Sequence, residues 1–196
     1  NSNRTQVQGN PTVCIDAAHG GSSTGGASGN YTEKAITLSV ALKVKEYLEE
    51  SGVNVVMTRT SDKDVTNEQR VKTCNDSKAS AMVSIHMNSA DKTVTAKGAE
   101  CWVHTKKPAD SQKLAEDVLK QLKSEAGFND RGVKYGTVAD NQEHYYINSH
   151  SSCASVVLQL GFITDSTDVK LVTDKLDTTA TAIADGIVEY LNGKAH

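Results

Sequence analysis

The residues best suited to chemistry in this chain are two histidines and one glutamate, His19, Glu33 and His86. Imidazole nitrogens and a carboxylate oxygen suit the borderline softness of Zn²⁺, and this ligand set leaves a fourth coordination position for water. Each residue alone also has an ordinary structural role, as a loop histidine, a glutamate that complements a helix dipole, or a core histidine. Taken together, the three residue types make a catalytic zinc site the first hypothesis.

The elements that carry these residues are expected to bring them together. His19 follows the first predicted strand, His86 lies near the end of the third, and Gln159 lies near the end of the last. Glu33 begins a long amphipathic helix. Because ligands of open α/β sheets bind outside the carboxyl ends of the strands, the four side chains should meet at one rim of the sheet.

Strands alternate with helices along the chain. Apolar runs predict strands in the segments 13–15, 54–59, 81–88, 97–105 and 155–162. The segment HYYIN (144–148) is either a further short strand or a pinned loop. The alternation predicts one α/β domain over residues 12–196, with a mostly parallel twisted sheet of about six strands and helices on both faces. The polar residues 1–11 are expected to form a flexible N-terminal tail.

Several sequence blocks occur in an order that matches a known family, namely IDAAHGG, EKAITLSVALKVKEYLEESGVNVVMTR, SIHMNSA, GAECWV, DRGVK and LQLGFITD. From about Val13 to Leu191 the chain resembles the zinc-dependent N-acetylmuramoyl-L-alanine amidases called amidase type 3. The resemblance implies that His19, Glu33 and His86 bind zinc. It also implies a peptidoglycan substrate, cleaved at the amide between N-acetylmuramic acid and L-alanine, and secretion to the cell wall. Zinc suits this reaction because it activates bound water and polarises a carbonyl group.

The chain departs from that family at Gln159. The family's last core strand reads roughly Leu-Val-Glu-hydrophobic-Gly-Phe, with Glu as the general base, whereas residues 157–162 read VLQLGF. An amide cannot take a proton from water, and the loss of a positioned general base typically costs about 10²–10⁴-fold in rate. Three interpretations follow: an engineered replacement of Glu by Gln, a natural enzyme that uses another base or zinc-bound hydroxide alone, or a natural non-catalytic relative that binds wall peptide or a partner.

Other polar residues extend the candidate site. The possible replacements for the missing base are Glu100, Glu143, His104 and His144. Asn88 could position the substrate, although an asparagine at a strand end often serves only as a cap. Arg131 could bind a carboxylate of the stem peptide through two hydrogen bonds, or could be an ordinary surface residue in a turn.

Composition narrows the class of protein further. The net charge of -3 argues against nucleic-acid binding, and no apolar stretch is long enough for a membrane span. A monomer is the default expectation. No CxxC pair is present, so a cysteine-rich structural zinc site is not expected. Cys14 and Cys101 are expected as buried thiols, whereas the presence of disulfides among the four cysteines stays open.

Overall fold

A six-stranded sheet forms the centre of the computed structural model, which describes residues 3–138 and 144–194. The strand order is β4-β1-β5-β8-β6-β7. These strands are β1 (Thr12–Ala17), β4 (Asn54–Met57), β5 (Ala81–Asn88), β6 (Ala99–Val103), β7 (Asp130–Tyr135) and β8 (Ala154–Phe162). Neighbouring strands are parallel except β6 and β8, which confirms the mostly parallel sheet. A small antiparallel hairpin, β2 (Ala27–Ser28) with β3 (Tyr31–Thr32), precedes the first helix.

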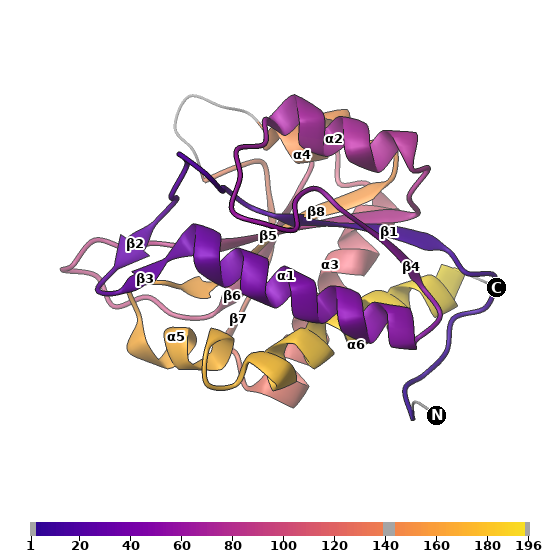
Figure 1. The fold of residues 1–196 in the computed structure, drawn as a ribbon. Coiled ribbons are helices and arrows are strands. Elements are labelled where there is room, and N and C mark those ends of the chain that lie inside the picture. Colours follow the sequence, from indigo (N-terminus) through magenta and orange to yellow (C-terminus); the bar gives the residue numbers. More distant parts are fainter. Residues whose placement is uncertain (1–2, 139–143, 195–196) are drawn as a thin grey trace.

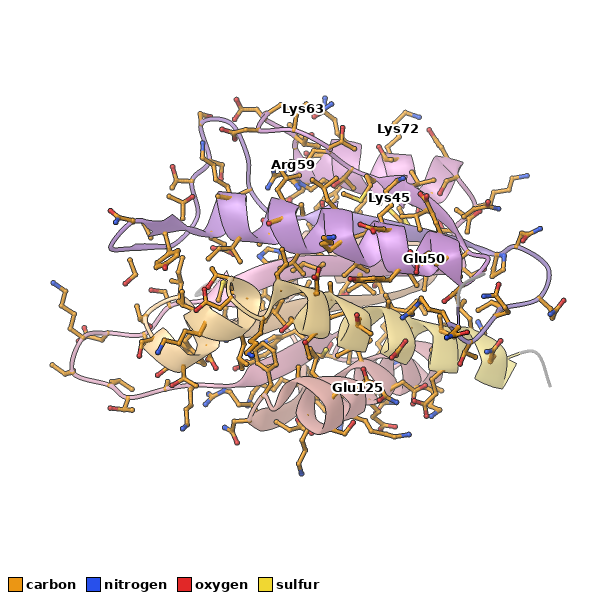
Figure 2. All side chains as sticks on the ribbon, turned by 60° about the horizontal axis from the view of Figure 1, so that its bottom comes forward. Lys45, Glu50, Arg59, Lys63, Lys72 and Glu125 are labelled. Carbon is orange, nitrogen blue, oxygen red and sulfur yellow. The ribbon has the colours of Figure 1, made fainter. Side chains whose placement is uncertain are left out.

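Helices cover both faces of the sheet, as predicted (Figure 1). One face is packed by α1 (Glu33–Glu50), α3 (Ala109–Gln121), which continues as the π-helical turn η1 (Leu122–Ala126), α5 (Ser166–Val172) and α6 (Leu176–Lys194). Figure 2 shows α1, α6 and α3 side by side on this face, which we call the α1 face. The other face, the α2 face, is packed by α2 (Asn67–Asp76) and α4 (Tyr146–His150), which lie together above the strands in Figure 1.

The alternation of side chains along the central strands separates the core from the site. On β5, Val83 and Ile85 belong to the large hydrophobic core of the α1 face. Because successive residues of a strand point to opposite faces, Ser84 and His86 point to the α2 face. The same alternation, together with the strand register, gives the α2 face a group of polar residues: Asp16, Ser84, His86, Glu100 and Gln159.

Local sequence signals explain several element ends. The side chain of Thr66 accepts a hydrogen bond from the backbone N–H of Gln69, whose side chain in turn binds the backbone N–H of Thr66. This reciprocal capping box starts α2. The last helix, α6, continues through Asn192 and Gly193 and ends at Lys194.

The sixth strand lies in a segment for which the sequence analysis predicted no strand, and HYYIN is neither the short strand nor the loop that it offered as alternatives. Residues 130–135 form β7, whereas HYYIN leads into helix α4. The strand β7 pairs only with β6 and is the edge of the sheet, so its side chains are mostly half-buried or exposed and its apolar signal is weak. The aromatic residues of HYYIN instead pack against the α2 face.

Residues 3–11 pack on the domain, which differs from the flexible tail expected from their polar composition. The guanidinium Nη2 of Arg4 lies 2.8 Å from Asp185 Oδ1. The backbone N–H of Val7 donates to the carbonyl oxygen of Ser51 at 2.8 Å, and the Val7 side chain is buried. Arg4 and Val7 therefore help to hold this segment against α1 and α6, together with the hydrogen bond from Gln6 Nε2 to the carbonyl oxygen of Glu50.

Two further expectations concern the cysteines and membranes. Cys14 and Cys101 are buried free thiols, as predicted. The Sγ atoms of Cys74 and Cys153 lie 3.7 Å apart, and the structure records both residues as free. Within the described residues, no helix has the length and apolar character needed to cross a membrane.

Candidate metal centre

The three residues predicted as metal ligands come together at the carboxyl ends of β1 and β5. His19 Nε2 lies 3.3 Å from Glu33 Oε1, and His86 Nδ1 lies 3.6 Å from Glu33 Oε2. One ligand atom from each residue lies within 4.8 Å of the others. Tetrahedral bonds of zinc length place neighbouring ligand atoms about 3.3–3.4 Å apart. The arrangement is therefore close to that of a metal site with three protein ligands.

A strained turn after β1 positions His19. Its backbone φ is 64°, in the left-handed region that non-glycine residues rarely adopt. The surrounding carbonyl groups are held by two buried arginines: Arg59 donates to the carbonyl oxygens of Ala17 and Ala18, and Arg70 to those of Ala17 and His19. These hydrogen bonds stabilise the turn and fix the direction in which the imidazole points.

The first residue of α1 supplies the carboxylate. Glu33 is buried, and its two oxygens accept hydrogen bonds from the backbone N–H groups of Gly26 and Met87, each at 2.9 Å. Burial acts to raise the pKa of Glu33, but the hydrogen bond with His19 and the charge of His86 outweigh it and hold the pKa below its usual range. Glu33 is thus a carboxylate that retains lone pairs for a cation.

The glycine loop fits closely around the ligands. A Cβ atom at Gly25 would lie 2.6 Å from both Glu33 Oε1 and His19 Cδ2, so only glycine allows the loop this approach. Burial lowers the pKa of His86, which favours the neutral imidazole that metals require. The donor set and its close packing are therefore compatible with a bound divalent cation.

Gln159 lies beside the metal ligands on the next strand. The strand register pairs it with His86 on β5 and with Glu100 on β6, so the three side chains share the α2 face. Its Nε2 donates to the hydroxyl of Tyr145 at 3.1 Å. Its Oε1 is buried and has no hydrogen-bond partner among the described residues. A buried acceptor without a donor is costly, and it marks a position suited to a group that brings a proton.

Glu100 binds the two residues predicted to contact substrate. Its Oε1 accepts from Asn88 Nδ2 at 3.0 Å and from Arg131 Nε at 2.8 Å, and its Oε2 accepts from Trp102 Nε1 at 2.7 Å. The Arg131 guanidinium also lies over the ring of Phe162. The structure therefore gathers Asn88 and Arg131 next to the site, and Glu100 is already engaged by three donors.

The other candidate bases lie away from the ligands or outside the described residues. Because β6 runs antiparallel to β8, His104 follows the end of β6 that is opposite the metal ligands. His144 stacks on His104 with 3.8 Å between the ring centroids. Glu143 lies outside the described residues. The structure does not bring His104 or His144 to the candidate metal centre.

A cavity of about 620 Å³ opens beside the ligands. It is bounded by the two candidate histidine ligands, His19 and His86, by aromatic residues before and within α4, including Tyr145, and by the start of α2, including Thr66 and Arg70. A larger hollow of about 770 Å³ lies at residues 3–5 and α6, where no set of metal ligands is found among the described residues. The smaller cavity is the one that gives access to the candidate chemistry.

Sequence reasoning missed three buried polar residues of the site, Asp16, Ser84 and Arg70. The Asp16 carboxylate accepts hydrogen bonds from Arg70 at 2.7 Å and from Ser84 at 2.6 Å. Burial acts to raise the pKa of Asp16, but Arg70 and the hydroxyl donors outweigh it and lower the pKa. Asp16 and Ser84 each interrupt an otherwise apolar strand, at a position whose side chain points to the α2 face. These two interruptions were the signal that could have revealed the network.

A family model described as N-acetylmuramoyl-L-alanine amidase matches residues 13–189. The chain is 37% identical over 182 residues to the uncharacterized protein YqiI of Bacillus subtilis, and covers 84% of it. It is 32% identical over 182 residues to N-acetylmuramoyl-L-alanine amidase LytC of the same organism, and covers 35% of that protein. Each match includes 91% of the present chain.

Among solved structures, the catalytic domain of the N-acetylmuramoyl-L-alanine amidase CwlV from Bacillus (Paenibacillus) polymyxa var. colistinus superposes with a TM-score of 0.81. The identity is 31%, over 93% of this chain and 98% of that one. The fold is a mostly parallel α/β sheet with a His-Glu-His cluster at its rim that could hold a metal ion, and the matched proteins define the class of protein as a hydrolase. The family match is more specific: the chain belongs to the N-acetylmuramoyl-L-alanine amidase family, and its fold is that of an amidase catalytic domain.

Proposed function

We propose that residues 12–196 form a zinc-dependent amidase domain that cleaves the amide between N-acetylmuramic acid and L-alanine in peptidoglycan. The observation that carries the proposal is the convergence of His19, Glu33 and His86, whose ligand atoms lie within 4.8 Å of one another beside an open cavity. The family match supports the choice of bond, and the relatives named as amidases support the choice of substrate. A domain with this substrate would work outside the cell, at the cell wall, and we propose a secreted monomer.

Zinc is the metal that we propose, because two imidazoles and one carboxylate are a recurring ligand set of catalytic zinc. When bound, zinc would supply a Lewis acid and a water of lowered pKa. The protein's own contribution is to hold His19 Nε2, His86 Nδ1 and Glu33 in place before the substrate arrives. Because the two arginines hold the turn that carries His19 and two backbone N–H groups hold the Glu33 carboxylate, little reorganisation of these two ligands is needed on binding.

Gln159 occupies the position of the general base, next to His86 in register. Its amide can orient a water molecule through Oε1, but it cannot accept a proton. Tyr145 donates or accepts only through one hydroxyl, whose pKa is raised by burial, and Glu100 is held by three donors. We therefore propose that this chain binds metal and substrate but hydrolyses the amide slowly.

Asn88 and Arg131 are the proposed substrate-binding residues. Arg131 uses Nε for Glu100, and the Arg131–Glu100 pair lies at the same strand ends as the ligands. A guanidinium has further N–H donors beyond Nε, and these suit a carboxylate of the stem peptide. Asn88 would act through its carbonyl oxygen, because its Nδ2 is bound to Glu100.

The experiment compares the chain with its Gln159→Glu variant on a purified muramyl peptide in the presence of zinc. Cleavage releases a new α-amino group on L-alanine, which can be labelled and quantified by chromatography. Restoration of a carboxylate at this position should raise the rate by at least about tenfold, within the usual range for a positioned general base.

The control is Glu33→Ala in the Gln159→Glu background, which should remove the gain because a ligand is lost. Equal rates with Gln159 and with Glu at this position would contradict the role of position 159 as the base. Binding of peptidoglycan without cleavage by either form would instead support a natural non-catalytic relative.

A further inference from the structure

One imidazole of the metal centre is connected to a buried chain of hydrogen bonds. His86 Nε2 lies 3.0 Å from the hydroxyl oxygen of Ser84, and this hydroxyl donates to Asp16 Oδ2 at 2.6 Å. The other carboxylate oxygen of Asp16 accepts from Arg70 at 2.7 Å and from Thr58 at 2.5 Å. Ser84 and Asp16 are almost fully buried, so water does not compete for these contacts.

The donor and acceptor in each of these hydrogen bonds follow from the number of protons that each group carries. Asp16 is paired with a guanidinium and, as a carboxylate, can only accept hydrogen bonds. Ser84 has one hydroxyl proton, which Asp16 takes. The Ser84 oxygen can then only accept from His86, so the ring proton of His86 must lie on Nε2.

The second nitrogen of His86 is thereby left without a proton. Nδ1 lies 3.6 Å from Glu33 Oε2, which is too long for a hydrogen bond, so the contact with Ser84 is the one that decides the position of the ring proton. We propose that Asp16 and Ser84 are positioning residues that fix His86 in the tautomer whose Nδ1 lone pair faces the metal. This inference rests on the ligand set of the proposed function, and adds the residues that prepare one ligand.

His19 provides a matched comparison within the same site. Its Nδ1 lies 2.8 Å from the hydroxyl of Ser23, which leaves Nε2 to face Glu33. Ser23 is exposed, however, so its hydroxyl can turn towards water and does not impose a direction. The structure assigns a fixed tautomer to His86 and an adaptable one to His19.

The first test measures the tautomer of the unaltered protein. Nitrogen NMR of the metal-free, ¹⁵N-histidine-labelled chain at about pH 8, where an imidazole is neutral, distinguishes a protonated from an unprotonated ring nitrogen. A His86→Ala spectrum assigns the signals. We expect the proton of His86 on Nε2, and a proton on Nδ1 would overturn the proposal.

The second test reverses the chain of hydrogen bonds through Asp16→Asn. The new amide is nearly isosteric, and its N–H₂ group can donate to Ser84, which then donates its own proton to His86 Nε2. The ring proton is expected to move to Nδ1, and zinc should bind more weakly. An unchanged tautomer in this variant would show that Asp16 does not set the position of the His86 ring proton.

The third test measures zinc affinity by competition with a chromophoric chelator. Loss of a hydrogen-bond partner of a ligating histidine typically weakens metal binding by about 10–100-fold, and we expect this for Ser84→Ala. Ser84→Thr keeps the hydroxyl and should preserve the affinity. Ser23→Ala should have a smaller effect than Ser84→Ala, and equal or reversed effects would overturn the contrast.

The results of these tests distinguish a failure of the tautomer proposal from a failure of the proposed function. If Gln159→Glu restores no hydrolysis but the His86 proton lies on Nε2, the proposed reaction is wrong and the positioning role of Asp16 and Ser84 stands. If hydrolysis is restored but Ser84→Ala binds zinc as tightly as the parent, the positioning role of Asp16 and Ser84 is wrong and the proposed reaction stands.

Discussion

The two faces of the central sheet are built from the same strands but do different work. On the α1 face the strands present an unbroken apolar surface to α1, α3 and α6. On the α2 face, β1, β5 and β8 each carry an apolar residue ahead of a polar one, in the pairs Cys14 and Asp16, Met82 and His86, Val157 and Gln159. The short helices α2 and α4 cover the apolar residues, Arg70 of α2 pairs with Asp16, and His86 lines the cavity.

The contrast between the two faces shows how one sheet can supply both stability and a reactive site. Full burial of a leucine or valine stabilises a fold by about 1.5–3 kcal/mol, so the α1 face carries most of the hydrophobic free energy. A buried ion pair such as Asp16–Arg70 adds little net stability, but the removal of one partner leaves an uncompensated charge. The α2 face therefore contributes geometry rather than stability, and its residues should respond differently to substitution.

The largest expected effect is the loss of zinc binding on substitution of a residue of the α2 face. His86→Ala should abolish stoichiometric zinc binding, because it removes one of three ligands, while the partly exposed side chain contributes little to packing. Metal analysis after dialysis measures the zinc content, and circular dichroism verifies the fold. Retained stoichiometric zinc would remove His86 from the ligand set.

The control for this prediction is a substitution on the opposite face of the neighbouring strand. Leu158 is fully buried on the α1 face, one residue before Gln159. Leu158→Ala should reduce the free energy of unfolding by about 2–5 kcal/mol and leave the zinc content of the folded protein unchanged. Zinc loss in this variant would show that the two faces are not independent.

Arg70→Met tests the charged network that connects α2 with β1. The variant leaves Asp16 buried without its cation and removes donors to the carbonyls of Ala17 and His19. We expect the free energy of unfolding at pH 7 to fall by about 3–5 kcal/mol. Adding Asp16→Asn to Arg70→Met should recover part of this loss, because the unpaired charge is gone. A double variant no more stable than Arg70→Met would contradict the pairing.

The same network predicts a pH dependence. The pKa of Asp16 is lowered in the folded state, so its contribution to stability is present above the ordinary pKa of 3.8 and is lost as the pH falls below it. The difference between the parent and Arg70→Met should therefore narrow in acid. Denaturant unfolding at several pH values between neutral and acid measures this difference, and a constant difference would argue against an ionised Asp16.

The sequence was sufficient to predict that the candidate ligands converge and to predict most of the fold, but not the network of hydrogen bonds behind the ligands. His19, Glu33 and His86 were singled out because their residue types suit zinc and because the sequence blocks around them resemble the amidase type 3 family. Asp16 and Ser84 lie inside strands that were read as continuous apolar runs, although their alternate positions placed them on one face. Their partner Arg70 comes from a helix whose docking depends on tertiary packing, which local patterns do not specify.

The smallest effect concerns the helix that supports the polar face from outside. Thr66→Ala removes the hydroxyl that accepts from the backbone N–H of Gln69 at the start of α2, four residues before Arg70, and should reduce the free energy of unfolding by about 1 kcal/mol. Thr32 is a matched control, since it occupies the N-cap of α1 but makes no side-chain capping hydrogen bond. Thr32→Ala should therefore change the free energy of unfolding less than Thr66→Ala, as measured by denaturant unfolding. Since the cap acts on α2 and not on the ligands, Thr66→Ala should leave the zinc content unchanged; a loss of zinc would mean that the position of Arg70 is more sensitive to α2 than the buried hydrogen bonds suggest.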